Sequence, residues 1–312
     1  MMITHLRVGT RGSQLALAQT NQVIEELNDA ISGLKCDIIP IQTRGDKTRE
    51  TGKADFEAIE GKDVFTKEIE EALIKGEVDI AIHSMKDLTV DLPQEVNIAA
   101  IPKRADPHDV LISHDKMSLM QLPAGSRIGT SSPRRRAQLL HARGDLNVVD
   151  IQGNIETRLR KLSNGSYDAI ILAAAGLDRL RLDTKRTEVL PTKLMLPAVG
   201  QGALAIQSRT SDKDTIDLVT RIDHPPTRRE IEAERAFSKR LGGNCRTPVA
   251  AYARSDSSRL IVEGMIATAN GNMLVKGRIT SDNPNSIQVG EELARSLLDK
   301  GAGTLLEEME CK

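Results

Sequence analysis

The chain has 312 residues, of which 39% are apolar and 28% are charged, a balance typical of a folded protein with two or three domains. Its 43 basic and 44 acidic side chains leave a net charge of −1, whereas a general nucleic-acid binder usually carries a basic excess. With no Trp, two Tyr and three Phe, the sequence also argues against a base-stacking surface for single strands. We therefore expect no nucleic-acid partner.

The N-terminus shows no charged segment followed by an apolar run, so we predict no signal peptide. No window approaches the roughly 18 apolar residues that a membrane-spanning helix needs, and we expect no membrane partner. The cysteines, Cys36, Cys245 and Cys311, lie far apart, match no metal-ligand spacing and fit a reducing compartment. The sequence thus predicts a cytoplasmic protein without a metal site.

In chain order, the first two-thirds of the sequence alternates short apolar runs with helical patterns, which predicts an α/β fold. Strands are expected at residues 5–9, 37–42 and 78–82, with helices after Ser13 and over 65–75. The pattern then restarts, with strands expected at 127–129, 148–151 and 168–173 and helices at 133–143 and 155–162. A strand over 204–208 is expected to return to the first domain.

The C-terminal part follows a different pattern, which predicts a small α+β domain. Its expected elements are helices over 228–240 and 287–298 and strands over 260–267 and 273–280. Asn270-Gly271, between these strands, is a strong signal for a type I′ hairpin. We predict three domains, formed by residues 1–102 with 203–220, residues 103–202, and residues 221–312, with crossings near Ile101-Pro102 and Leu196-Pro197-Ala198.

The most informative local segment follows the strand at 127–129 and opens a helix. Pro133 suits the first helical position, and the hydroxyls and backbone N–H groups of Thr130, Ser131 and Ser132 would lie at the positive end of that helix. Arg134 and Arg135 add forked donors that match carboxylates. An anion site is one interpretation, and a capped, solvated basic helix is an equally weighted alternative.

Two further strand ends carry polar side chains. Arg11 and Ser13 follow the first expected strand, as residues 130–132 follow the strand at 127–129. A lone arginine, however, is more often a surface residue than a ligand. Ser84, Lys86 and Asp87 follow the strand at 78–82, where α/β folds place binding groups, and Asp87 is a candidate for proton handling. A simple ion pair between Lys86 and Asp87 is the alternative.

Cys245 lies in a glycine-rich loop before an expected strand. Arg246 would favour its thiolate, which is the nucleophilic form of the side chain. A lone cysteine is more often a small buried side chain, and no histidine or asparagine motif accompanies it as in a cysteine protease. The loop alone leaves both interpretations open.

Taken together and in order, these segments resemble the porphobilinogen deaminases over essentially the whole chain. Singly the matching segments are short, but their shared order makes the resemblance specific. They are Thr10-Arg11-Gly12-Ser13-Gln14-Leu15-Ala16, Thr43-Arg44-Gly45-Asp46, Phe65-Thr66-Lys67-Glu68, His83-Ser84-Met85-Lys86-Asp87, Gly129-Thr130-Ser131-Ser132, Gly153-Asn154 with Thr157-Arg158-Leu159, Asp168-Ala169-Ile170-Ile171-Leu172-Ala173, Leu196-Pro197-Ala198-Val199-Gly200-Gln201-Gly202-Ala203 and the cysteine loop before Pro248.

The resemblance implies two lobes similar to type II periplasmic binding proteins and a smaller C-terminal α+β domain. It implies a hydroxymethylbilane synthase activity, in which four porphobilinogen molecules are condensed head to tail with loss of ammonia. It also implies a dipyrromethane cofactor held by Cys245 through a thioether, with Asp87 as the catalytic carboxylate. We expect a monomer.

The same resemblance implies two sets of binding residues. For the cofactor these are Ser84, Lys86, Thr130, Ser131, Ser132, Arg134 and Arg135. For the substrate, each ring of which brings an acetate and a propionate, they are Arg11, Ser13, Arg158, Gln152, Asn154 and Gln201.

Two positions depart from the family pattern. Gln152 stands where the family has an arginine before Gly153-Asn154, and Arg136 or Arg160 could compensate for the lost charge. The cysteine loop reads Gly-Gly-Asn-Cys in place of the commoner Glu-Gly-Gly-Cys. The main rival function is a non-catalytic, two-lobed carboxylate-binding protein, which would need neither Cys245 nor Asp87. An RNA-binding protein that uses residues 134–136 is disfavoured by the neutral net charge.

Overall fold

The computed structural model describes residues 3–46, 66–242, 247–303 and 305. Its internal contacts divide the chain into two compact units. Unit 1 comprises Met1–Ala105 with Ala203–Arg228, and unit 2 comprises Asp106–Gly202 with Arg229–Lys312. Within the described ranges, no helix has the length and apolar character needed to cross a membrane.

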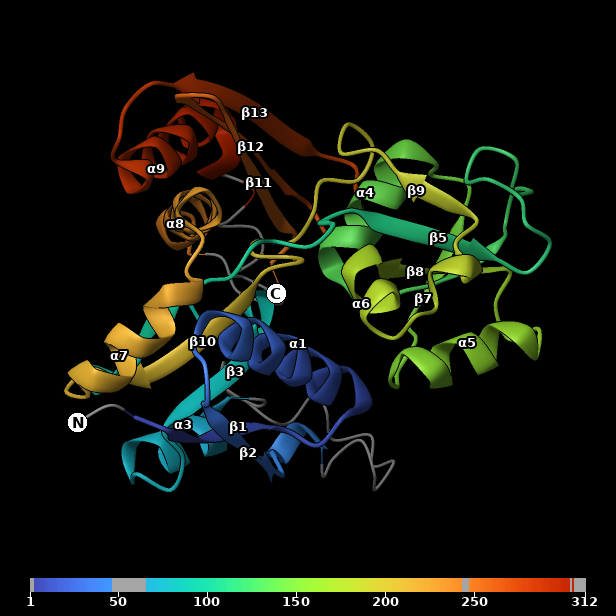
Figure 1. Ribbon diagram of the computed structural model, residues 1–312. Helices are drawn as coiled ribbons and strands as arrows, with labels where there is room; N and C mark the ends of the chain where they lie inside the picture. Colours follow the sequence, from blue (N-terminus) through green and yellow to red (C-terminus); the bar gives the residue numbers. More distant parts are fainter. Residues whose placement is uncertain (1–2, 47–65, 243–246, 304, 306–312) are drawn as a thin grey trace. The chain divides into compact units, whose positions relative to one another are not determined.

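Unit 1 is built on a five-stranded sheet in the order β2-β1-β3-β10-β4 (Figure 1). The strands are β1 His5–Arg11, β2 Lys35–Ile41, β3 Ile80–Ser84, β4 Val96–Ala100 and β10 Leu204–Arg209. β1 runs parallel to β2 and β3, whereas β10 is antiparallel to β3 and β4. The prediction that the strand near 204–208 returns to the first sheet is confirmed.

Helices cover both faces of this sheet because β3 is apolar on both sides. Ile80 and Ile82 pack against α1 (Gln14–Ala30), and Ala81 packs against α3 (Lys67–Ile74). The unit also contains α7 (Lys213–Val219) and the short helical turns η1 (Met85–Asp87) and η3 (Thr220–Ile222). Buried parallel strands with helices on both faces are the usual α/β arrangement.

Unit 2 begins with a second five-stranded sheet, in the order β7-β6-β8-β5-β9. Its strands are β5 Asp109–Ser113, β6 Arg127–Gly129, β7 Asn147–Val149, β8 Ala169–Ala173 and β9 Glu188–Leu190. Its helices are α4 Pro133–Ala142, α5 Ile155–Ser163 and α6 Ala174–Arg179, with a short turn η2 at Asp183–Lys185. β6 is parallel to β7 and β8 while β5 is antiparallel to β8, which repeats the arrangement of unit 1.

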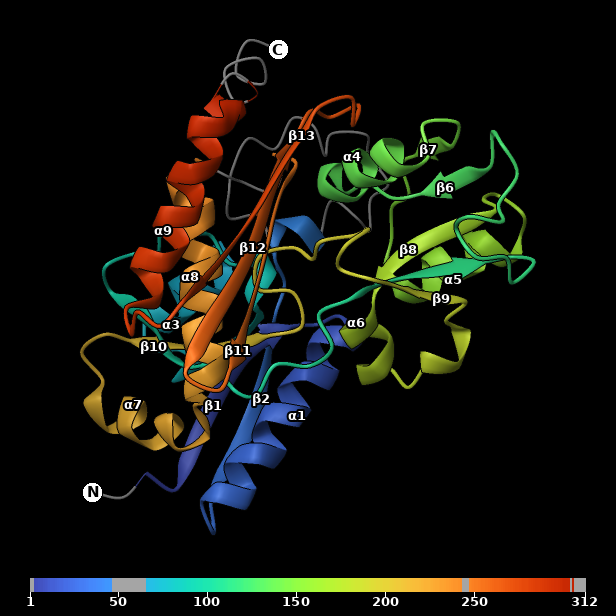
Figure 2. The same cartoon turned by 90° about the horizontal axis from the view of Figure 1, so that it is seen from above.

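The C-terminal part of unit 2 has its own antiparallel sheet, β11-β12-β13 (Figure 2). These strands are Val249–Asp256, Arg259–Ala267 and Leu274–Ser281, and they pack with α8 (Pro225–Arg240), α9 (Ser286–Leu297) and η4 (Leu298–Ala302). The predicted α/β class with a smaller C-terminal α+β part is confirmed. The three-domain division stays a prediction.

The predicted type I′ turn at Asn270-Gly271 is wrong, although the hairpin exists. The strands pair up to Ala267 and Leu274, so the connection is longer than two residues. Gly271 has a φ of +72°, but Asn270 does not share the positive φ that a type I′ turn requires. The Thr268 N–H donates to the Met273 carbonyl oxygen at 2.9 Å, which closes the longer loop, and within that loop Gly271 packs closely against α4.

Candidate active site

The carboxyl ends of β1 and β3 meet at one edge of the unit 1 sheet, and a pocket lies there. Arg11 ends β1, Ser84 ends β3, and η1 carries Asp87 directly after it. The pocket is lined by Arg11, Ser13, Leu15, Ala16, Gln19, Thr66, Ile82, His83, Ser84 and Asp87. The structure therefore brings together four residues predicted from two separate motifs: Arg11 and Ser13 from one, and Ser84 and Asp87 from the other.

Asp87 is partly exposed in this pocket. Its carboxylate makes no hydrogen bond or ion pair with the described residues, so it is open to a ligand. Lys86, next to it, is also partly exposed but does not line the pocket. The alternative of a simple Lys86–Asp87 ion pair is not what the structure shows.

Arg11 is already paired with a carboxylate. Its guanidinium contacts both oxygens of Asp46, with Nε donating to Oδ2 at 3.3 Å. Asp46 also accepts a 2.7 Å hydrogen bond from the Thr43 hydroxyl. Burial would raise the pKa of Asp46, but these hydrogen bonds outweigh it and lower the pKa. A second anion at Arg11 would therefore share a guanidinium that Asp46 partly neutralises.

Gln19 is a pocket residue that the sequence motifs did not single out. Its Nε2 donates to Ser84 Oγ at 2.8 Å, and Ser84 Oγ lies 3.1 Å from its Oε1. This pair joins α1 to the end of β3 and fixes the position of the Ser84 hydroxyl. The sequence did contain a signal for Gln19, because it is a polar residue on the helix face that points to the core. The other buried residues on this face include Ala16, Thr20 and Val23.

Unit 2 contains the second predicted strand end, at the start of α4. Pro133 is the first helical residue, and Ser132 Oγ accepts a hydrogen bond from the Arg135 N–H at 3.4 Å, so the predicted cap is confirmed. Thr130 Oγ1 accepts from the Ser132 N–H at 3.2 Å. Ser131 Oγ donates to the Ile151 carbonyl oxygen at 2.9 Å. All three hydroxyls thus have partners in the protein's own backbone.

Arg134 and Arg135 are buried, with exposed fractions of 5% and 7%, so the alternative of a solvated basic helix is wrong for them. Arg135 Nε donates to Asp109 Oδ1 at 2.9 Å, and Arg134 Nη1 lies 2.7 Å from Asp109 Oδ2. Asp109, in β5, is fully buried. Burial would raise its pKa, but the two guanidinium groups lower it far below the ordinary value. One carboxylate therefore serves two cations, which leaves one positive charge in excess.

Gln201 is also buried and is part of this cluster. Its Nε2 donates to Asp109 Oδ1 at 3.0 Å and to the Pro107 carbonyl oxygen at 2.7 Å. The adjacent Gly200 N–H donates to Glu234 Oε2 at 2.7 Å. Gln201 is a predicted substrate-binding residue, but it is only 1% exposed and is already bound within the protein.

Three more predicted residues lie in α5 and in the segment just before it. Asn154 caps the helix through a 2.8 Å hydrogen bond from the Thr157 N–H, and Arg158 Nε donates to the Gly153 carbonyl oxygen at 2.9 Å. Gly153 has a φ of +113°, and a Cβ there would lie 2.7 Å from the Thr157 side chain. Gln152 is exposed, so an arginine could occupy its position without entering the core.

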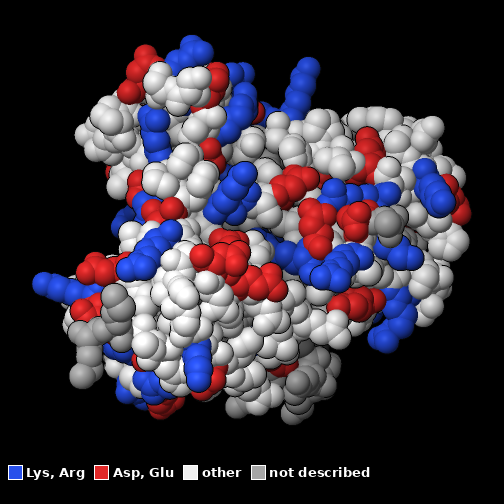
Figure 3. All heavy atoms as spheres, viewed as in Figure 1, with Lys and Arg blue, Asp and Glu red and all other residues white. Residues whose placement is uncertain are grey.

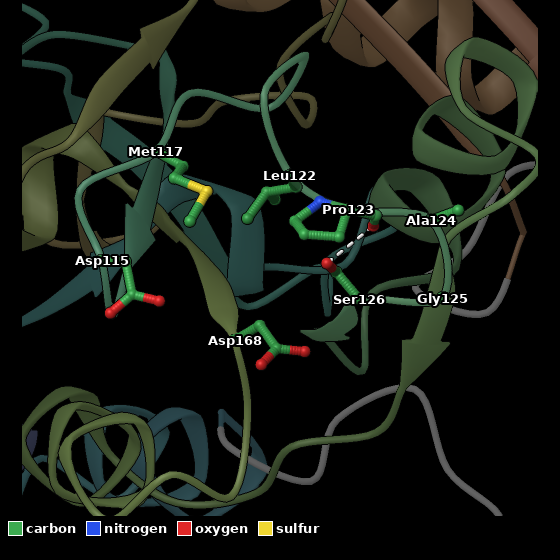
Figure 4. A pocket seen from close by; sticks show the side chains of 8 residues that line it. All are labelled: Asp115, Met117, Leu122, Pro123, Ala124, Gly125, Ser126 and Asp168. Carbon is green, nitrogen blue, oxygen red and sulfur yellow. Dashed lines mark hydrogen bonds between the residues drawn. The ribbon is translucent and has the colours of Figure 1, made fainter.

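A further pocket in unit 2 contains none of the predicted residues (Figure 4). Asp115 and Asp168 lie on one side of it and Met117 and Leu122 on the other. Asp168 accepts a 2.6 Å hydrogen bond from the Arg127 N–H, and Ser126 donates to the Pro123 carbonyl oxygen at 2.7 Å. Because these polar groups serve the local fold, the unit 1 pocket is the better candidate site.

Cys245 and its neighbour Asn244 lie outside the described residues. Within the described ranges, no cluster of His, Cys, Asp and Glu side chains has the geometry to hold a metal ion. On the face of the molecule drawn in Figure 3, basic and acidic side chains are interspersed.

The α/β units with a polar pocket at the strand ends have the arrangement of the α/β class of proteins, which place their ligand-binding groups at such ends. Two family models match the chain: the dipyrromethane cofactor-binding domain of porphobilinogen deaminase over residues 6–217, and the C-terminal domain of the same family over residues 228–299. The chain belongs to the porphobilinogen deaminase family.

Curated relatives agree with this membership. The porphobilinogen deaminase of Syntrophus aciditrophicus is 44% identical over 305 residues, which cover 98% of this chain and 99% of the relative. That of Syntrophomonas wolfei is 46% identical over 302 residues, which cover 97% and 98%. Among solved structures, the methionine-binding protein MetQ is similar at 13% identity over 69% of this chain and 90% of that chain, with a TM-score of 0.43.

Proposed function

We propose that Asp87 is the catalytic carboxylate of the porphobilinogen deaminase reaction in this chain, the stepwise condensation of four porphobilinogen molecules with loss of ammonia. The observation that carries the proposal is an unpartnered carboxylate in a polar strand-end pocket. Loss of ammonia from porphobilinogen leaves a cation that is delocalised over the pyrrole ring. A fixed carboxylate beside the pyrrole N–H stabilises that charge best where water is scarce.

The substrate's carboxylates would be held by the pocket and by the polar strand ends. Arg11 and Ser13 lie in the same pocket as Asp87, which supports their proposed role in binding substrate. Four further residues of unit 2 remain proposed substrate-binding residues because of the resemblance to the family. They are Arg158, Gln152, Asn154 and Gln201.

The residues of unit 2 fit a cofactor with several carboxylates. Arg134 and Arg135 share the single carboxylate of Asp109, and Arg134 Nε is buried without a hydrogen-bond partner among the described residues. Excess buried positive charge of this kind favours an anionic ligand. We propose that these arginines and the hydroxyls of residues 130–132 bind the dipyrromethane, and Ser84 and Lys86 remain proposed cofactor-binding residues on the resemblance to the family. When bound, that group supplies the free pyrrole α-carbon to which the first substrate is joined.

Cys245 is the proposed attachment point of the cofactor, and intact mass measurement tests it. The purified chain should be heavier than its sequence by two linked pyrrole units, and Cys245→Ser should lose that mass. Cys36→Ser, at a half-buried position in β2, is the matched control and should keep the mass. A full adduct on Cys245→Ser would overturn the attachment, and absence of porphobilinogen turnover by the unaltered, loaded protein would overturn the function.

A cytoplasmic location and a monomeric state are further parts of the proposal. The sparse cysteines support the location, because they fit a reducing compartment. Sedimentation of the loaded protein would test the monomer, for which a mass near 34.1 kDa is expected.

A further inference from the structure

His83 is a buried pocket residue that the proposed mechanism does not yet use. It is the residue before Ser84 in β3, is 5% exposed and lines the pocket that contains Asp87. Its Nε2 atom is buried without a hydrogen-bond partner among the described residues.

Two residues from other elements, Gln207 and Arg11, affect the protonation of this imidazole. Gln207 of β10 lies two residues beyond Ala205, which is paired with His83, so both side chains lie on the same face of the sheet. Gln207 Nε2 donates to Glu70 Oε1 at 2.9 Å. Because a carboxylate can only accept, the amide oxygen of Gln207 points away from Glu70, and it has no hydrogen-bond partner among the described residues.

The imidazole is neutral at physiological pH. Burial lowers the pKa of His83 to about 4, with the nearby Arg11 charge lowering it further and Gln207 partly opposing both. A neutral imidazole carries one ring proton, and the acceptor oxygen of Gln207 favours that proton on the nitrogen nearer to it. The other ring nitrogen is then an acceptor, which repels a carboxylate and pairs with an N–H donor.

Thr66 supplies a second acceptor to the same pocket. It lies at the N-terminus of α3 and is 1% exposed, and its hydroxyl is buried without a partner among the described residues. Porphobilinogen has two N–H donor groups, the pyrrole N–H and the aminomethyl ammonium. The proposed role of Asp87 accounts for the first and leaves the second without a binding group.

We propose that His83 and Thr66 bind the aminomethyl nitrogen of porphobilinogen, the group that leaves as ammonia. This inference rests on the proposed function of the pocket. When the carbon–nitrogen bond breaks, its electron pair goes to nitrogen, so the group must stay protonated until it leaves. A weakly basic imidazole accepts a hydrogen bond from the ammonium without removing its proton, and so positions the leaving group in its reactive form.

The test compares two substrates that differ only in the leaving group: porphobilinogen, and the analogue with a hydroxymethyl in place of the aminomethyl. His83→Leu should lower kcat/KM for porphobilinogen by about 10- to 150-fold, the worth of a hydrogen bond to a charged group. The loss for the uncharged analogue should be several times smaller. His83→Gln, which keeps an acceptor, should restore most of the original ratio.

His141→Leu is the matched control, because His141 lies on α4 and contacts the Gly271 carbonyl oxygen at 3.0 Å, outside the pocket. It should leave the substrate ratio unchanged. Thr66→Val, which keeps size, gives an independent measurement if His83→Leu fails to fold, and it should shift the ratio in the same direction. Equal losses with both substrates in His83→Leu, or an unchanged ratio in Thr66→Val, would overturn the inference. The proposed function would stand as long as the unaltered protein turns over porphobilinogen.

Discussion

Arg11, which lines the unit 1 pocket, forms a two-point ion pair with Asp46, and the Thr43 hydroxyl donates to the same carboxylate. The pair orients the Arg11 guanidinium, but it also reduces the positive charge that is available to bind a substrate carboxylate. Sequence motifs placed both residues in the family pattern without showing that they touch. We therefore expect Asp46 to weaken the proposed binding of a substrate carboxylate by Arg11.

We expect Asp46→Asn to lower KM for porphobilinogen several-fold, because the negative charge that offsets the Arg11 guanidinium would be removed. Folding stability should fall by about 1 kcal/mol as the pair is lost. Asp79→Asn is the control, since Asp79 forms a similar two-point pair with Arg7 in the same unit but outside the pocket. Steady-state kinetics would contradict this prediction if both variants changed KM equally.

Asp87→Asn should leave the fold intact and reduce kcat by roughly 100-fold or more, because the exchange keeps size but deletes the stabilising charge. The side chain has no partner among the described residues, so the unfolding midpoint should hardly change. Single-turnover measurements on protein whose cofactor mass has been verified would check this. Near-normal turnover in the loaded variant would show that Asp87 has no catalytic role.

Asp109→Asn should destabilise the protein by about 3–5 kcal/mol, because two buried guanidinium groups would lose their carboxylate. The depressed pKa of Asp109 fixes the sign of the pH effect. Its contribution is fully present above about pH 4, the ordinary value for an aspartate, and is lost as the pH falls below that value. The variant should therefore lose part of the acid sensitivity seen in denaturant unfolding.

Asp150→Asn provides the comparison for this measurement. Asp150 pairs with Arg136 at 2.8 Å, but its side chain is 71% exposed, so its loss should cost less than about 1 kcal/mol. Equal destabilisation of the two variants would mean that the buried cluster contributes no more than a surface pair.

Gly271→Ala should destabilise unit 2 more than Gly165→Ala does. The two glycines have nearly equal φ values of +72° and +71°, but only at Gly271 would a Cβ collide with backbone, at 2.4 Å from the Ala137 carbonyl oxygen. Because the backbone strain is the same at both positions, the difference in stability between the two variants measures the collision alone. Equal unfolding midpoints would show that the hairpin loop can move off α4 without cost.

Gln152→Arg tests the departure from the family pattern. Arg136 binds the Val148 carbonyl oxygen at 2.7 Å and the exposed Asp150, and we expect it to compensate for the missing arginine. Arg136→Ala should then be severe alone and be rescued substantially by Gln152→Arg in a double-mutant cycle measured on chain elongation. Strict additivity of the two changes would rule out compensation by Arg136.

Local patterns in the sequence determined most of the secondary structure and the family. The cap at Ser13 and the proline at the start of α4 both follow from short-range signals. Such signals work because capping and apolar periodicity depend on residues that are neighbours along the chain. Asp87 and Ser84 were found in the same way, since a strand end is visible in the sequence.

Only the tertiary structure decided which polar groups meet. The sequence predicts that Arg134 donates to a ligand, but the residue is buried against Asp109, which lies 25 residues earlier in the chain. Ser84 binds Gln19, and Gly271 packs against α4 from a loop that is longer than the two-residue turn its sequence predicts. In each case the partner comes from a distant segment, and the burial of a charge or the approach of a backbone depends on packing that no local pattern encodes.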